Sequence, residues 1–300
     1  MAKIFNTFIT QLFQADKEKT PGELWYFKIV ELFIVIYTIK YACQWAGYIP
    51  RNTDVVLPLG IAHYIDISFM FGEIIPVINA VFITVLSLLC FFNIQFRWQY
   101  FVVLILLHVQ FAARYSQGEI PHSMNMVGMS LLALALANIL FKKNWQISRF
   151  TFGSIYFFVG LSYFSAGISK LIGTGLNWFD GRHLWLWIGE KGTDILSRTG
   201  TFELNFLQEL AMQSVAMASA ILLFGWLTEF AGILIWSRKC RPYITTAVIG
   251  MHIGITLTMN IRFDAYVIEL ILIGYPWGRL LDKYAHRLPD FKKLRLLSSR

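Results

Sequence analysis

The chain has 300 residues, of which 56% are hydrophobic and only 15% are charged, and its mean hydropathy is +0.55. These values exclude an ordinary soluble globular protein and indicate an integral membrane protein. The net charge of +8 lies mainly in loops and tails beside apolar runs, so it follows membrane topology and indicates no nucleic-acid partner. The three cysteines have no metal-ligand spacing, and we expect neither a bound metal nor a disulfide framework.

Residues 1–20 are expected to form an amphipathic segment on the membrane surface, because their apolar side chains recur at helical spacing. Residues 21–283 then form one transmembrane domain, and residues 284–300 form a basic cytoplasmic tail. Backbone groups in lipid must be hydrogen-bonded within their own segment, so the domain is predicted to be all-α, a polytopic bundle of about eight transmembrane helices. The eight apolar runs are 26–46, 74–93, 98–115, 122–141, 150–170, 206–237, 243–261 and 264–279.

The run 206–237 is longer than a membrane span needs. It fits a tilted span, a span kinked near Gly225, or a surface helix followed by a span. Cytoplasmic loops are enriched in lysine and arginine. Placing both termini in the cytoplasm puts 18 of the 26 cationic residues on the inner side, so we expect an integral cell-membrane protein with that orientation. Two long outer segments, 47–73 and 171–205, are rich in tryptophan and tyrosine and are predicted to form interfacial helices over the bundle mouth.

Lys170 ends the fifth run on the outer side, after the small residues Ser165, Ala166, Gly167 and Ser169. One interpretation is a lysine that snorkels to the interface. The other is a partly desolvated lysine whose pKa falls towards neutral and which acts as a base. A carboxylate in contact would instead hold it protonated, and we expect Asp180 or Glu119 to be the acidic residue that could do so.

Other polar residues in the runs also require an explanation, because burying them in lipid costs free energy. His122 follows Pro121 at the start of the fourth run, on the same side as Lys170. It is either an interfacial histidine or a group that orients a substrate oxygen. Glu229 and His252 lie at similar depths and are expected to pair with each other by a hydrogen bond or through one water.

Further charged residues have local interpretations. Lys28 and Glu31, three residues apart, are predicted to form an ion pair. Arg114 is expected to anchor the third run at the interface, whereas Asp264 and Glu269 in the eighth run fit either a structural or a functional role. No nucleophile elbow, P-loop, metal signature or haem attachment pattern occurs in the sequence.

Three segments resemble the membrane domain shared by vitamin K-dependent gamma-carboxylases and the bacterial horizontally transferred transmembrane (HTTM) proteins. The most distinctive runs from Tyr163 to Gly181 and contains Ala-Gly-x-x-Lys-Leu followed by Trp-x-x-Gly. His122-Ser-Met-Asn-Met-Val-Gly is similar to the family's fourth-span histidine motif, and Gly-Met-His-Ile at 250–253 resembles a later histidine-bearing span. The resemblance covers roughly residues 20–280.

The resemblance implies a reduced quinone, similar to vitamin K, in an outward-facing pocket. Lys170 matches the family lysine held to deprotonate the quinol, and His122 matches the histidine near the quinone. The remaining expected site residues shape the lid or line the pocket: Trp178, Asp180, Gly181, Asn125, His252 and Glu229. The implied activity is carboxylase- or epoxidase-like.

The sequence departs from the carboxylases in two respects. Ser169 stands where they carry the first of two adjacent lysines, and only about 20 residues follow the last run instead of a large substrate-gripping domain. We therefore expect a quinol pocket rather than carboxylation of protein glutamates. The alternatives are an SdpB-like factor that presents its outer loops to a secreted peptide during maturation or export, and a passive scaffold.

Overall fold

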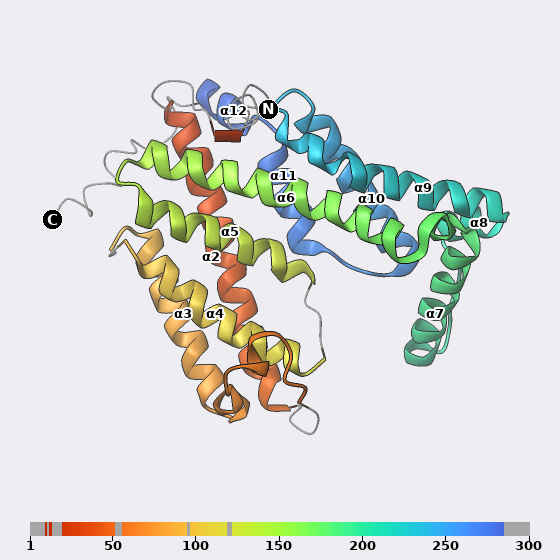
Figure 1. Cartoon of the computed structure of the whole chain (residues 1–300), viewed down its shortest axis with the longest axis horizontal. Coiled ribbons are helices and arrows are strands. Elements are labelled where there is room, and N and C mark those ends of the chain that lie inside the picture. The colour runs from red at the N-terminus through yellow and green to blue at the C-terminus, as the bar shows by residue number, and fades with distance from the viewer. Residues whose placement is uncertain are drawn as a thin grey trace. The chain divides into compact units, whose positions relative to one another are not determined.

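The computed structural model describes residues 20–51, 56–94, 97–118 and 122–284, together with Thr10, Leu12 and Phe13. All regular structure in these residues is helical, and none of them forms a strand (Figure 1). The predicted all-α class is therefore confirmed. Most of the amphipathic segment predicted over 1–20, and nearly all of the basic tail predicted over 284–300, lie outside the described residues.

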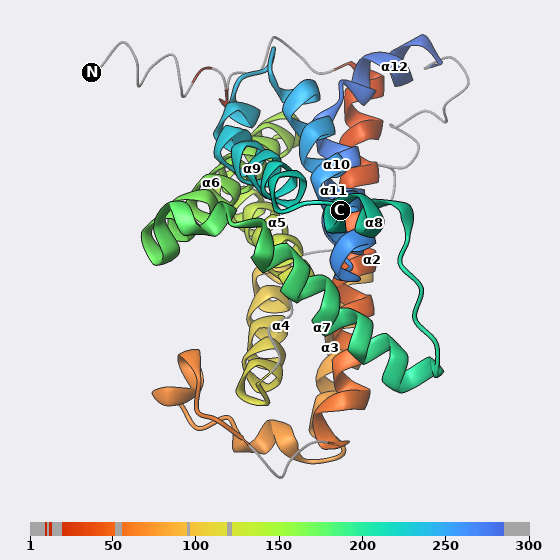
Figure 2. The same cartoon turned by 90° about the vertical axis from the view of Figure 1, so that its right-hand side faces the viewer.

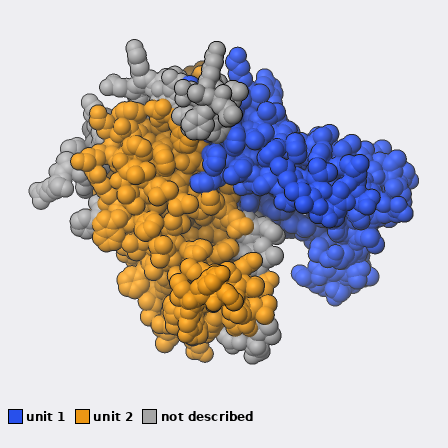
Figure 3. All heavy atoms as spheres, in the orientation of Figure 1, with its two compact units in different colours: residues 1–12, 156–275 blue, residues 13–155, 276–300 orange. Residues whose placement is uncertain are grey.

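Three helical segments are long and apolar enough to cross a membrane: Asn144–Phe179, Val215–Trp236 and Arg241–Met259. Two shorter helical stretches, Ile75–Phe91 and Met124–Leu140, are also apolar. The chain divides into two compact units, shown in two colours in Figure 3. Unit 1 comprises residues 1–12 and 156–275, and unit 2 comprises residues 13–155 and 276–300.

Unit 2 is arranged around its first long helix, α2, which packs against α3, α4, α5 and α12. The elements of unit 2 are α2 (Pro21–Tyr48), η1 (Ile49–Arg51), η2 (Gly60–His63), η3 (Ser68–Phe71), α3 (Ile75–Phe91), α4 (Gln99–Ser116), α5 (His122–Leu140), the beginning of α6 (Asn144–Thr174) and α12 (Trp277–Lys283). Thr20 and Glu23 form a capping box that starts α2. Asp282 of α12 accepts hydrogen bonds from the Thr20 hydroxyl (2.7 Å) and the Gly22 amide (2.8 Å), which attaches α12 to that helix end.

A buried polar network links three helices of unit 2. The predicted Lys28–Glu31 ion pair is confirmed, with Nζ 2.8 Å from Oε2. Lys28 also donates to the carbonyl of Phe91 at the end of α3 (2.6 Å), and the hydroxyl of Tyr100 in α4 donates to Glu31 (2.6 Å). Arg114 is 2% exposed, donates to Gln117 (2.6 Å) and lies over the ring of Tyr48. It is therefore buried within the protein, and its role as an interface anchor stays a prediction.

Unit 1 contains the rest of α6 and the elements that follow it. These are η4 (Gly175–Phe179), α7 (Gly181–Thr199), α8 (Phe206–Met212), α9 (Val215–Ala231), η5 (Gly232–Trp236), α10 (Arg241–Met259) and α11 (Asp264–Gly274). Leu184 and Ile188 of α7 pack with Ala211 and Ala218 of α8 and α9 in an apolar cluster. Figure 2 shows the chain leaving α7 and returning to α8 through an extended stretch, which begins at Gly200 with φ of 77°.

The structure selects one alternative for the run 206–237, a short helix followed by a longer one, and corrects the run 264–279. The run 206–237 is two helices, since Ser214 breaks the backbone and accepts a hydrogen bond from the Met217 amide (3.1 Å) to start α9. Gly225 lies inside α9 and causes no break. The run 264–279 is not one helix: α11 has 11 residues and stops before Pro276. At about 1.5 Å per residue it is about half the length of the membrane's hydrocarbon core.

Candidate functional site

An ion pair between α6 and α9 is the first element of the candidate site. Lys170 lies one turn before the end of α6, and its ammonium binds the carboxylate of Glu229 in α9. The side chains are 27% and 10% exposed respectively, so the carboxylate is the more deeply buried partner. Lys170 Nζ also lies 5.2 Å from the ring of Trp178. Within the part of the chain that the structure describes, Oε2 of Glu229 is buried and has no hydrogen-bond partner.

The second element is a hydrogen bond between α6 and α10. The Tyr163 hydroxyl and Nε2 of His252 are 2.5 Å apart. Tyr163 precedes Lys170 by seven residues, which is two helical turns, so both side chains leave the same face of α6. His252 is 4% exposed, and its Nδ1 has no hydrogen-bond partner among the described residues.

Aromatic and acidic side chains from α11 and its approach complete the arrangement. The ring of Phe263 is 4.6 Å from that of His252, and the ring of Tyr266 is 5.8 Å from it. Glu269 follows Tyr266 by three residues in α11, close to one helical turn, and is 2% exposed. We name Tyr163, Lys170, Glu229, His252, Tyr266 and Glu269 the α6 polar cluster. It belongs entirely to unit 1.

Close approach of α6 to α9 and η5 brings these groups together. At Gly232 a Cβ atom would lie 2.5 Å from the Cβ of Tyr163, so only glycine fits there. The indole of Trp226 donates to the Gly167 carbonyl (2.9 Å), and the indole of Trp236 donates to the Phe157 carbonyl (3.3 Å). Small residues at such a contact let two apolar helices pack at short distance.

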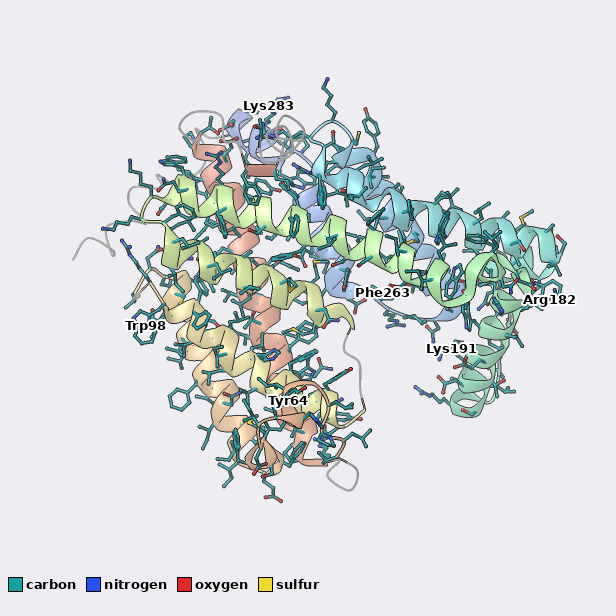
Figure 4. All side chains as sticks on the ribbon, viewed as in Figure 1. Tyr64, Trp98, Arg182, Lys191, Phe263 and Lys283 are labelled. Carbon is teal, nitrogen blue, oxygen red and sulfur yellow. The ribbon has the colours of Figure 1, made fainter. Side chains whose placement is uncertain are left out.

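The predicted lid residues have structural roles in the described contacts. Asp180 caps α7 by accepting from the Arg182 amide (3.0 Å) and pairs with the Arg182 side chain, which Figure 4 labels at the start of α7. These hydrogen bonds lower the pKa of Asp180 from its ordinary value of 3.8. Gly181 donates to the Ser219 hydroxyl (2.9 Å), and a Cβ there would collide with the α9 backbone. Trp178 packs against Trp187, with ring centroids 5.5 Å apart.

The structure corrects two sequence-based expectations about pairing. The direct hydrogen bond expected between Glu229 and His252 is absent, because each takes its partner from α6, while the alternative contact through one water stays a prediction. Lys170 does not lack a counter-charge, because Glu229 supplies it. The carboxylate is neither of the two that the sequence suggested: Asp180 is paired with Arg182, and Glu119 lies outside the described residues.

The other expected site residues lie in unit 2. His122 is the first residue of α5, but its side chain is not among those that the structure describes, so its proximity to Lys170 stays a prediction. Asn125 is exposed on α5. Among the described residues, no group of three histidine, cysteine, aspartate or glutamate side chains could hold a metal ion.

Sequence reasoning assigned no role to Tyr163 or Tyr266. A signal was present for both: Tyr163 is two turns before Lys170 on one helix face, and Tyr266 precedes Glu269 by three residues. Comparison with known proteins adds no assignment, because no protein-family model, curated protein or solved structure matches this chain. The candidate site therefore rests on the residues of the α6 polar cluster and their contacts.

Proposed function

We propose that this chain is an integral membrane protein of the HTTM type whose α6 polar cluster binds the head group of a lipid-soluble quinol. In this proposal the long apolar helices cross the membrane, both termini are cytoplasmic, and α7 lies at the outer interface. The burial of ionisable groups carries the proposal. Glu229, His252 and Glu269 are each at least nine-tenths buried among apolar helices. Such groups cost free energy in lipid and usually mark a functional pathway.

The described side chains fit a quinol head group. Oε2 of Glu229 can accept a hydrogen bond from a phenolic hydroxyl, and Nδ1 of His252 can donate or accept according to its tautomer. The rings of Tyr163, Phe263 and Tyr266 surround His252 with aromatic surface that suits a flat ligand ring. When bound, a reduced quinone supplies two electrons and two ionisable hydroxyl groups.

The proton chemistry is assigned to the Lys170–Glu229 pair as a unit. An ammonium cannot accept a proton, so Lys170 acts as a base only after its proton moves to Glu229. In the paired state the carboxylate accepts the proton of a ligand hydroxyl, and the ammonium stabilises the oxyanion that forms. The Tyr163 hydroxyl forms a hydrogen bond with Nε2 of His252 and thereby sets the orientation of the imidazole ring.

The sequence resemblance to the gamma-carboxylase membrane domain favours a vitamin K-like quinol over other lipid-soluble phenols. It extends the proposal to carboxylase- or epoxidase-like chemistry on the outer side of the membrane.

Binding of reduced phylloquinone to the protein in nanodiscs tests the proposal. Glu229→Gln and His252→Phe each remove one group proposed to contact the head group. We expect each substitution to weaken binding about tenfold, the effect of losing one hydrogen bond to a charged or buried group. Glu31→Gln is the matched control, because Glu31 is an equally buried, paired carboxylate in unit 2. Equal affinity in wild type and both cluster variants would overturn the proposal.

An exposed apolar surface favours a second candidate function, an SdpB-like factor for a secreted peptide. Tyr64, labelled in Figure 4, is 85% exposed, and its neighbours Ile65 and Phe69 are 54% and 55% exposed. A photoreactive amino acid at position 64 distinguishes the two functions. Cross-linking of a secreted peptide, together with no measurable quinol affinity, would support the factor instead of the quinol-binding protein.

A further inference from the structure

A cationic connection joins η5 to α10 in unit 1. Arg238, Lys239 and Arg241 lie within four residues, and no aspartate or glutamate occurs anywhere from Phe230 to Phe263. The connection lies between two helical segments that are each long and apolar enough to cross a membrane. Its positive charge therefore has no acidic neighbour in the adjoining sequence.

Arg241 differs from an ordinary surface cation. Its guanidinium carbon lies 3.4 Å from the centroid of the Tyr156 ring, and its Nε donates to the Ile235 carbonyl (3.0 Å). Its Nη2 is buried but has no hydrogen-bond partner in the part of the chain that the structure describes. The residue as a whole is only half-buried, so the side chain remains partly accessible to solvent. Arg241 makes no ion pair with a described residue.

The guanidinium is held in place and shielded on one face, but no described residue supplies a counter-charge. A partly desolvated cation is costly until an anion compensates it. Because the charge is delocalised over the planar group, an anion that reaches the guanidinium compensates this charge. Tyr156 and the Ile235 carbonyl fix the plane of Arg241, which lowers the entropy lost when a ligand binds.

We infer that Arg241, with the nearby Lys239, binds a phosphate group, and that the phosphate belongs to the head group of an anionic lipid. Basic sites beside membrane helices recognise lipid phosphates, and arginine is well suited to phosphate oxygens. The position between two apolar helices favours a lipid over a free ion, because a lipid head group lies at that depth when its chains are in the bilayer. This inference is independent of the quinol proposal.

A titration of the delipidated protein in neutral detergent tests the inference. Dioctanoyl-phosphatidylglycerol, dioctanoyl-phosphatidylcholine and inorganic phosphate are each added while the unfolding temperature is measured. Phosphatidylglycerol should raise the unfolding temperature and phosphatidylcholine should not, because a ligand that binds only the folded state stabilises it. Arg241→Gln should weaken the apparent affinity about tenfold, the effect of losing one charge-assisted hydrogen bond. The double substitution of Lys142 and Lys143 by glutamine is the control, since both are exposed cations in a similar short loop.

A second measurement uses only the wild-type chain, in case Arg241→Gln does not fold. Photoreactive phosphatidylglycerol should cross-link to residues 237–243 in preference to residues 141–149. Equal stabilisation by inorganic phosphate would support a phosphate site and identify the free ion as its source. The inference would be overturned if both lipids stabilised the protein equally, or if the Lys142/Lys143 control lost as much phosphatidylglycerol affinity as Arg241→Gln. Cross-linking mainly at 141–149 would also overturn it.

Discussion

Removing one partner of the Lys170–Glu229 pair should destabilise the protein unequally, according to which charge remains. In Lys170→Met the remaining Glu229 carboxylate is only 10% exposed. Breaking a buried pair in this way costs about 3–5 kcal/mol, and we expect about 3 kcal/mol because the lysine side of the pair is partly open to water. In Glu229→Gln the remaining ammonium is 27% exposed and lies near the Trp178 ring, so we expect a loss of about 1–2 kcal/mol.

The double substitution Lys170→Met with Glu229→Gln removes both charges, so no uncompensated charge remains. We therefore expect it to be more stable than Lys170→Met alone, with a coupling free energy of about 1–3 kcal/mol in the double-mutant cycle. The free energy of unfolding is measured by titrating a denaturing detergent into mixed micelles and following helix content by circular dichroism.

The control is the exposed pair of Lys191, labelled in Figure 4, and Glu190, whose side chains are 33% and 65% exposed. Exposed pairs contribute about 0–1 kcal/mol, so Lys191→Met should change stability little. The reasoning is refuted if Lys170→Met is no less stable than Lys191→Met, or if the effects of the two single substitutions in the buried pair simply add.

Three further predictions concern helix packing, titration and topology. Gly181→Ala should lower the free energy of unfolding by about 1–3 kcal/mol, because the added Cβ overpacks against α9. A Cβ added at Gly189 meets no atom within 4 Å, so Gly189→Ala should leave the free energy of unfolding unchanged or raise it by up to about 1 kcal/mol. Arg182→Gln should raise the Asp180 pKa towards 3.8 in a carboxyl-carbon NMR titration, and an unchanged pKa would contradict the assignment. Because the folded-state pKa is lowered, the contribution of this cap to the free energy of unfolding is complete above pH 3.8 and is lost as pH falls through the lowered pKa. Cysteines introduced into 142–149 should escape an impermeant thiol reagent in intact cells, while cysteines in the exposed face of α7 should react; the reverse pattern would invert the proposed orientation.

Hydropathy was sufficient to predict that the apolar runs are helices, but it could not locate every helix end. The run 206–237 is apolar on average, and the structure divides it into α8 and α9 at Gln213 and Ser214, where the Ser214 side chain caps α9. Likewise, α11 ends before Pro276 although apolar residues continue beyond it. Hydropathy averages over many residues, whereas a cap is one hydrogen bond between a side chain and a nearby amide.

Interactions within one helix were readable from spacing, and interactions between helices were not. The Lys28–Glu31 pair follows from a separation of three residues, because those positions are neighbours on any α-helix. The sequence also indicated that Lys170, Glu229 and His252 are unusual, because ionisable groups in apolar runs need partners.

The partners themselves depended on tertiary structure. Depth along a helix can be estimated from sequence, but the rotation of each helix about its axis cannot, and rotation decides which side chains meet. Close packing at Gly232 brings α9 and η5 onto the face of α6 that carries Tyr163 and Lys170. Glu229 therefore meets Lys170 rather than His252, and His252 meets Tyr163. Sequence alone determined the helical class and the polar residues that needed partners, since these follow from local composition; the packing of distant helices determined which partners they have.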